Sequence, residues 1–125
     1  MAWKLNSSEP IYLQLMSVIK SRIVSGTYAL GDKFPSVREI ATEAGVNPNT
    51  MQKALAELEQ EGLLITNRTS GRFVTDDAGI VEKIKAESAH ELVEKFIKNM
   101  RERGFSDEEI IKLIEDYLDE KNRKE

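Results

Sequence analysis

The fold is decided by residues 34–74, FPSVREIATEAGVNPNTMQKALAELEQEGLLITNRTSGRFV. Ser36, followed three residues later by Glu39, forms a capping box, which predicts a helix that begins at Ser36. Asn47 is a strong N-cap, and Pro48 occupies the first helical position, where its missing N–H costs no hydrogen bond. Two short helices joined by such a turn are typical of a helix-turn-helix, whose second helix can enter a DNA major groove.

The residues after Pro48 predict a recognition helix followed by a hairpin. A buried stripe at helical spacing consists of Met51, Ala54, Leu55 and Leu58, and Gly62 ends the helix. Two strands at 63–66 and 72–75 flank a turn at 67–71. Arg68 and Arg72 lie at the tip of this hairpin. A basic hairpin directly after a recognition helix is a wing, so the domain is predicted to be a winged helix-turn-helix.

Several segments make the chain resemble the GntR family of bacterial transcription regulators. The matching residues are GDKFPSVREIA at 31–41, VNPNT at 46–50, GRFV at 71–74, and Ala54, Leu55, Glu57, Leu58, Glu61 and Gly62, with Pro10, Ile11, Tyr12, Gln14 and Leu15 upstream. The VNPNT turn and the short helical tail look most like the YtrA-type subfamily. The resemblance implies a mainly α fold with a small β-hairpin wing, and a homodimeric repressor that binds a palindromic operator in double-stranded DNA.

The rest of the chain predicts an N-terminal helix and a helical tail. Residues 1–6 are expected to form an apolar plug or a contact with a second subunit, and Ser7 or Ser8 is expected to cap a helix that runs to Ser25. The polar segment 75–79 contains no apolar anchor and serves as the domain boundary. We therefore expect a DNA-binding domain at 1–76 and a dimerisation or regulatory tail at 77–125.

Two amphipathic helices are expected in the tail, from 80 to 103 and from a second capping box at Ser106 onwards. Their apolar faces exceed what a helical hairpin can bury against itself. A homodimer is the economical solution, because palindromic operators need two-fold symmetric readers. The residues expected at the dimer interface are Phe96, Ile97, Met100, Ile114 and Leu118.

The expected DNA contacts fall into three groups. The helix N-terminus at Ser36 suits a phosphate, and Arg38 matches the arginine that family members use on DNA. The start of the recognition helix supplies Asn47, Asn49, Thr50, Gln52 and Lys53, and the wing supplies Arg68, Ser70, Gly71 and Arg72. Many relatives carry arginine at positions 48 and 52, where this chain has Pro48 and Gln52. Since asparagine and glutamine suit adenine and arginine suits guanine, Asn49 and Gln52 are expected to be the main base readers.

The chain carries a formal net charge of −4, and its charges are unevenly distributed. Residues 1–76 hold 8 basic and 8 acidic residues, whereas residues 77–125 hold 10 basic and 14 acidic residues. A neutral domain with a local basic edge predicts modest non-specific DNA affinity.

Composition also excludes most enzymatic and membrane functions. Cysteine is absent, the only histidine is His90, and no phosphate-binding glycine loop occurs. We expect no catalytic residue, metal ligand or cofactor, and a cytoplasmic protein without membrane association. Two alternatives remain open: a protein-interaction adaptor built on a winged helix with an acidic tail, and control by an effector of unknown identity that binds at an interface.

Overall fold

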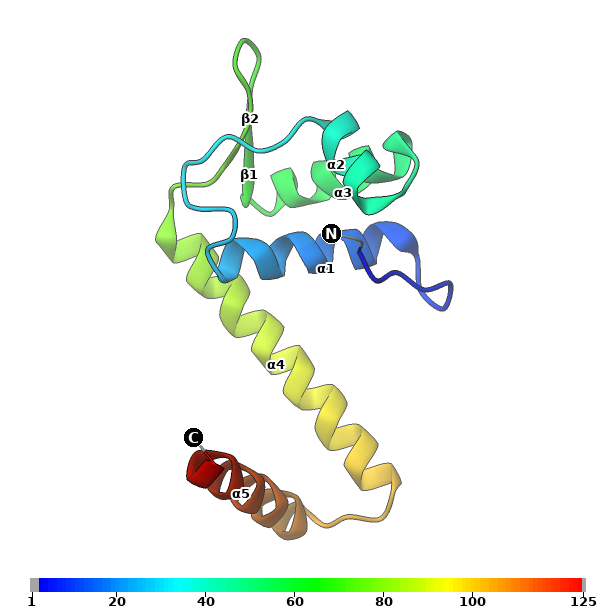
Figure 1. The fold of residues 1–125 in the computed structure, drawn as a ribbon, viewed down its shortest axis with the longest axis vertical. Coiled ribbons are helices and arrows are strands. Elements are labelled where there is room, and N and C mark those ends of the chain that lie inside the picture. Colours follow the sequence, from blue (N-terminus) through cyan, green and yellow to red (C-terminus); the bar gives the residue numbers. More distant parts are fainter. Residues whose placement is uncertain (1–2, 125) are drawn as a thin grey trace. The chain divides into compact units, whose positions relative to one another are not determined.

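The computed structural model describes residues 3–124 (Figure 1). The elements in chain order are α1 (Ile11–Val24), α2 (Val37–Ala44), α3 (Pro48–Gln60), β1 (Leu64–Asn67), β2 (Gly71–Val74), α4 (Ala78–Glu102) and α5 (Asp107–Lys124). They divide into two compact units, the winged unit up to Lys85 and the tail unit from Ala86 onwards. Mainly helical architecture with a single antiparallel hairpin confirms the predicted fold class.

The core of the winged unit is built around α3, which packs against both α1 and α2. The predicted stripe on α3 is fully buried, and one face of α1 and three residues of α2, Ile40, Ala41 and Ala44, are buried with it. The largest side chains in this core are Leu15, Ile19, Ile40, Met51, Leu55 and Leu58. Burying a side chain of this size stabilises the fold by about 1.5–3 kcal/mol. The buried face of α3 therefore fixes the position of the helix and of its exposed side chains.

The N-terminal segment differs in part from its prediction. α1 begins at Ile11 with Pro10 as its N-cap, so the predicted cap at Ser7 or Ser8 is wrong. The residue before a proline is disfavoured in helical conformation, and the Ser8 amide instead donates to the Asn6 side chain. Trp3 is buried in the core, which confirms the apolar plug for the described part of residues 1–6; Met1 and Ala2 lie outside the described residues.

Trp3 also joins a polar cluster that no local sequence pattern indicates. Its indole Nε1 donates to Glu43 Oε2 at 2.6 Å, and the Arg22 guanidinium lies 4.6 Å from its ring centroid. Arg22 Nη1 also donates to Glu43 Oε2 at 2.8 Å. The hydrogen bonds from Arg22 and then from Trp3 lower the pKa of Glu43 below its ordinary value. This cluster ties the N-terminal segment to α1 and α2.

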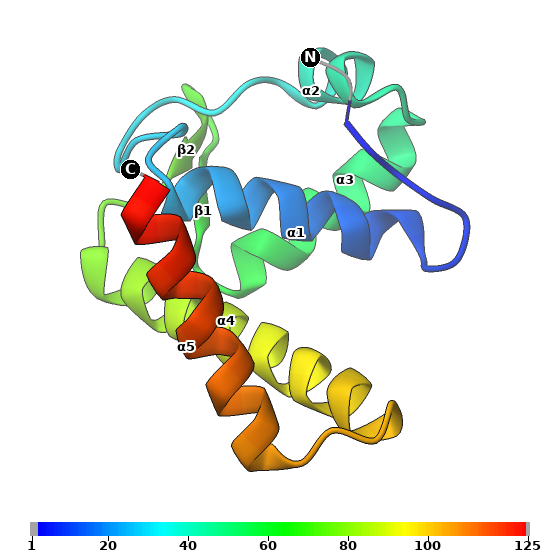
Figure 2. The ribbon, with the colours of Figure 1, turned by 60° about the horizontal axis from the view of Figure 1, so that its bottom comes forward.

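The wing is an antiparallel pair in which Leu64 lies opposite Val74 and Asn67 lies opposite Gly71. The segment before α2 adds a short third edge, because Lys33 bridges Phe73 and the Phe34 amide donates to the Arg72 carbonyl at 2.8 Å. The base of the hairpin is therefore fixed to the approach to α2 (Figures 1 and 2).

The segment 75–79 is anchored, contrary to the expectation of a polar linker without anchors. Thr75 is buried, and its amide donates to the Leu63 carbonyl at 2.9 Å. Asp77 Oδ1 accepts hydrogen bonds from the amides of Gly79 and Ile80 at the start of α4. Val81 and Ile84 are buried in the winged core. The expectation considered apolar side chains alone. A polar segment can be held equally firmly by hydrogen bonds that involve its backbone amides.

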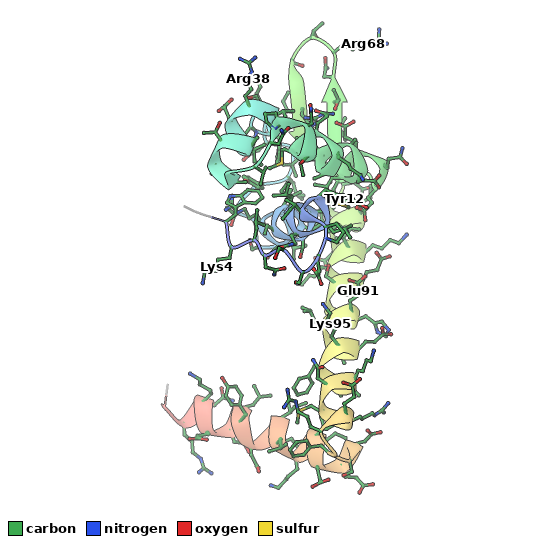
Figure 3. The ribbon with its side chains drawn as sticks, turned by 90° about the vertical axis from the view of Figure 1, so that its right-hand side faces the viewer. Lys4, Tyr12, Arg38, Arg68, Glu91 and Lys95 are labelled. Atoms are coloured by element: carbon green, nitrogen blue, oxygen red, sulfur yellow. The ribbon has the colours of Figure 1, made fainter. Side chains whose placement is uncertain are left out.

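The tail unit contains the C-terminal part of α4 and the whole of α5. Their connection is well defined: Ser106 forms the predicted capping box with Glu109, and Arg101 binds Asp107 through two hydrogen bonds of 3.0 Å. Ile110 is buried near this turn. Beyond it, α5 turns away from the C-terminal part of α4 instead of lying along it (Figure 3). The compact units meet between Lys85 and Ala86, within α4 and not at the segment 75–79. The predicted domain ranges 1–76 and 77–125 therefore stay a prediction.

Candidate nucleic-acid interface

The N-terminus of α2 is the first part of the candidate interface. Ser36 accepts a hydrogen bond from the Glu39 amide at 3.2 Å, and Glu39 Oε1 accepts one from the Ser36 amide. Arg38 is exposed in the first turn that follows. Figure 3 shows Arg38 and Arg68 projecting at the same end of the winged unit, away from Lys4. Helix N-termini attract anions, so this corner suits a phosphate group.

The first turns of α3 present the predicted base-reading residues. Asn47 is the N-cap, and its side chain accepts a hydrogen bond from the Asn49 amide at 2.7 Å. Asn49 and Gln52 are exposed, while Thr50 is half-buried. Helix geometry puts Asn49 opposite the buried stripe of Met51, Ala54, Leu55 and Leu58, and Gln52 on a flank of that stripe. Asn49 and Gln52 are therefore free to contact base edges, whereas the Asn47 side chain is occupied in holding the helix start.

Lys53 has a partner that was not predicted. Its ammonium lies 4.0 Å from the centroid of the Tyr12 ring on α1, which is a cation–π contact. Such a contact at an exposed site is worth about 0.5–1 kcal/mol. A phosphate must compete with Tyr12 for this lysine, at a cost of about the same size.

The wing turn is ordered by Asn67, whose side-chain oxygen accepts hydrogen bonds from the Thr69 amide and hydroxyl at 3.0 and 2.9 Å. This turn exposes Arg68 at the tip, with Ser70 beside it. Gly71 has φ +99°, a conformation that side-chain-bearing residues rarely adopt. The tip therefore holds a fixed shape and displays one cation.

Arg72 is not free in the same way. Its Nε donates to Glu59 Oε1 of α3 at 2.6 Å, and the Thr66 hydroxyl donates to the same oxygen at 2.6 Å. Partial burial raises the pKa of Glu59, but the hydrogen bonds from Thr66 and Arg72 and the charge of Arg72 together lower it below its ordinary value. The carboxylate thus stays ionised and joins both wing strands to the recognition helix.

These parts surround an open hollow of about 720 Å³ between the start of α2 and the wing. Its lining includes Lys33, Ser36 and Glu39 on one side, and Thr66, Gly71 and Arg72 on the other. The structure thus brings three predicted contacts, Ser36, Gly71 and Arg72, to one hollow. The Glu59 partnership was missed because the sequence does not reveal which acid of α3 faces the hairpin.

Other kinds of site find no support among the described residues. Within 3–124, no group of three histidine, cysteine, aspartate or glutamate side chains could hold a metal ion. No helix in this range is long and apolar enough to cross a membrane. The surface formed by the start of α2, the start of α3 and the wing is therefore the candidate functional site.

A family profile decides the identification: the profile described as bacterial regulatory proteins, gntR family, matches residues 11–74. The chain belongs to the GntR family. An uncharacterized HTH-type transcriptional regulator of Bacillus subtilis, YhcF, is 41% identical over 113 residues, which span 90% of this chain and 93% of that protein. The HTH-type transcriptional repressor YtrA of the same organism is 46% identical over 72 residues, covering 58% of this chain and 55% of YtrA.

Solved structures agree with this assignment. A GntR family transcriptional regulator from Listeria monocytogenes superposes with a TM-score of 0.82 at 41% identity, covering 90% of this chain and 98% of that one. The DNA-binding domain of AraR, solved in complex with operator ORX1, superposes with a TM-score of 0.54 at 28% identity, covering 60% of this chain and 95% of that domain. The protein is therefore a GntR-family transcriptional regulator with a winged helix DNA-binding domain, and YtrA-like relatives are consistent with the predicted subfamily. Members of the family are regulators and not enzymes, in agreement with the sequence analysis.

Proposed function

We propose that this GntR regulator is a homodimeric repressor that binds a palindromic operator and acts in the cytoplasm. The observation that carries the proposal is the exposed, polar start of α3 beside a wing that displays Arg68. A solved relative, the AraR DNA-binding domain, is described in complex with an operator. Repression is suggested by YtrA, which is described as a repressor.

The proposed contacts divide by their chemistry. Asn49 and Gln52 read base edges, since both side chains are exposed and amides suit adenine. Phosphates are contacted at Ser36 and Arg38 on α2 and at Thr50 and Lys53 on α3. Asn47 caps the start of α3 and so positions Thr50 and Lys53. The wing meets the backbone or the minor groove through Arg68, Ser70 and Gly71, with Arg72 behind them.

The dimer is proposed to form through the tail unit. Of the twelve large hydrophobic side chains exposed within the described residues, nine lie after Ala86. They include Phe96, Ile114 and Leu118, and the other two expected interface residues, Ile97 and Met100, are half-buried. An exposed apolar surface of this kind is rare on a monomer. A second copy is the proposed occupant, because a two-fold reader suits a two-fold operator. An effector, if one acts, would bind at that interface.

A titration separates this function from the adaptor alternative. The full chain is titrated at a stated salt concentration with a duplex from the DNA upstream of its own gene, and with a shuffled duplex of the same composition. A GntR repressor should bind the first duplex more tightly than the shuffled one. The difference in binding free energy should be about 1–3 kcal/mol for each operator base pair that the shuffling disrupts. Equal affinity for both duplexes would favour the adaptor.

Base readout and phosphate contact are expected to depend on different, neighbouring residues of α3. Gln52→Ala should relax the preference at one base per half-site, costing about 1–3 kcal/mol of discrimination. Lys53→Ala should weaken binding to every duplex alike and flatten the log–log salt dependence by roughly one unit. Both are measured over a series of singly altered operators. A uniform loss with Gln52→Ala would show that this side chain does not read a base.

A further inference from the structure

The Glu59–Arg72 pair occupies a position that bears on DNA selectivity. Glu59 follows Gln52 by seven residues, which places both side chains on one flank of α3, two turns apart. That flank faces the wing, because Glu59 Oε1 accepts from Thr66 on β1 and from Arg72 on β2. The proposed base reader and the attachment of the wing therefore share one side of the recognition helix.

The pair also neutralises a charge at the hollow. The Arg72 side chain is 14% exposed and lines the hollow beside the N-terminus of α2. An unpaired arginine there would attract any phosphate, whatever the base sequence. With Glu59 at 2.6 Å, the pair has no net charge. The attraction for phosphate is then left to Lys33, which lines the same hollow, and to the exposed Arg68 in the wing turn.

We propose that Glu59 is a specificity-determining residue of DNA binding, which positions the wing on the reading flank of α3 and withholds the charge of Arg72 from sequence-independent contact with phosphate. The inference rests on the proposed function of a sequence-specific DNA binder. It gives an acidic residue of the recognition helix a role at the DNA surface through its partner Arg72, without a contact of its own to DNA.

The deciding variant is Glu59→Gln, which removes the charge and keeps a side-chain oxygen that can accept from Arg72 and Thr66. Glu61→Gln is the matched control. Glu61 lies at the end of the same helix, its side chain is 32% exposed against 31% for Glu59, and it pairs with Lys20 of α1 on the opposite flank at 2.9 Å. Both variants change the net charge equally, so a difference between them reports position.

Affinities are measured for the full chain with two duplexes, one enriched by the wild-type protein from a random pool and one shuffled, across a range of salt concentrations. Glu59→Gln should bind the shuffled duplex severalfold more tightly, with a log–log salt slope steeper by up to about one unit. The enriched duplex should gain less, because a neutral amide holds Arg72, and with it the wing, less firmly than a carboxylate does. The ratio of the two affinities should therefore fall severalfold. Adding Arg72→Gln should return the shuffled affinity and the slope to wild-type values.

A purely structural pair would change the melting temperature without changing the salt slope. If Glu59→Gln matches Glu61→Gln in shuffled affinity and slope, the inference is overturned, while a selective wild-type chain leaves the proposed function intact. A wild-type chain that enriches no sequence overturns the proposed function and the inference together.

Discussion

Ile114→Asp combined with Leu118→Asp should convert the protein to a monomer and lower its affinity for a palindromic operator by about 10²–10⁴-fold. Both side chains are exposed, at 39% and 51%, so the fold of the monomer does not depend on their burial. A charge in the middle of an apolar dimer interface must be desolvated without a partner, which opposes association strongly. The loss of affinity reflects the linkage of two reading heads, since the second head binds at high effective concentration only within a dimer.

Lys112→Asp provides the matched control for this variant. It changes the net charge by the same two units, and it lies on the polar face of α5, where Lys112 pairs with Asp116 at 2.8 Å. An exposed pair of this type contributes only about 0.3–0.5 kcal/mol. The control should remain dimeric in sedimentation equilibrium and bind DNA as the wild type does. An unchanged dimer in the double variant would place the subunit contact outside α5.

Truncation after Gly79 should destabilise the winged unit by about 3–6 kcal/mol relative to truncation after Ser88. The shorter piece lacks Val81 and Ile84, which are buried in the winged core, and burial of each is worth about 1.5–3 kcal/mol. This figure is an upper estimate, because the unfolded chain already buries part of its apolar surface. Many small domains have 5–15 kcal/mol in total, so the shorter piece should be largely unfolded or close to it.

Urea denaturation of the two pieces, followed by circular dichroism, measures this difference. The longer piece should unfold cooperatively at a higher midpoint. Lys85→Ala in the longer piece serves as a control, because its side chain is exposed next to Ile84 and should shift the midpoint little. Equal midpoints for the two pieces would mean that the first turns of α4 contribute nothing to the winged core.

Much of this fold follows from local signals. The capping boxes at Ser36 and Ser106 and the Asn47–Pro48 helix start act within a few residues, so the sequence predicts them directly. The buried stripe of α3 follows from its periodicity. The wing is predicted because its turn residues and its strands are contiguous.

The missed features depend on partners far away in the sequence. Glu43 lies 40 residues from Trp3, and Glu59 lies 13 residues from Arg72, so only the tertiary fold decides which acid meets which base. The anchored segment after the wing was missed for a related reason. Thr75 is held by a backbone hydrogen bond to Leu63 and by burial, neither of which leaves a pattern in the composition of 75–79.

Selection of bound duplexes from a random DNA pool by the 125-residue chain is the sharpest measurement of two-fold operator reading by α3. A two-fold symmetric dimer that reads bases with α3 should enrich a palindromic sequence, with adenine prominent opposite Asn49 or Gln52 in each half-site. The same selection with Ile114→Asp and Leu118→Asp should lose the second half-site. Enrichment of no sequence, or of an asymmetric sequence unaffected by the double variant, would contradict the account.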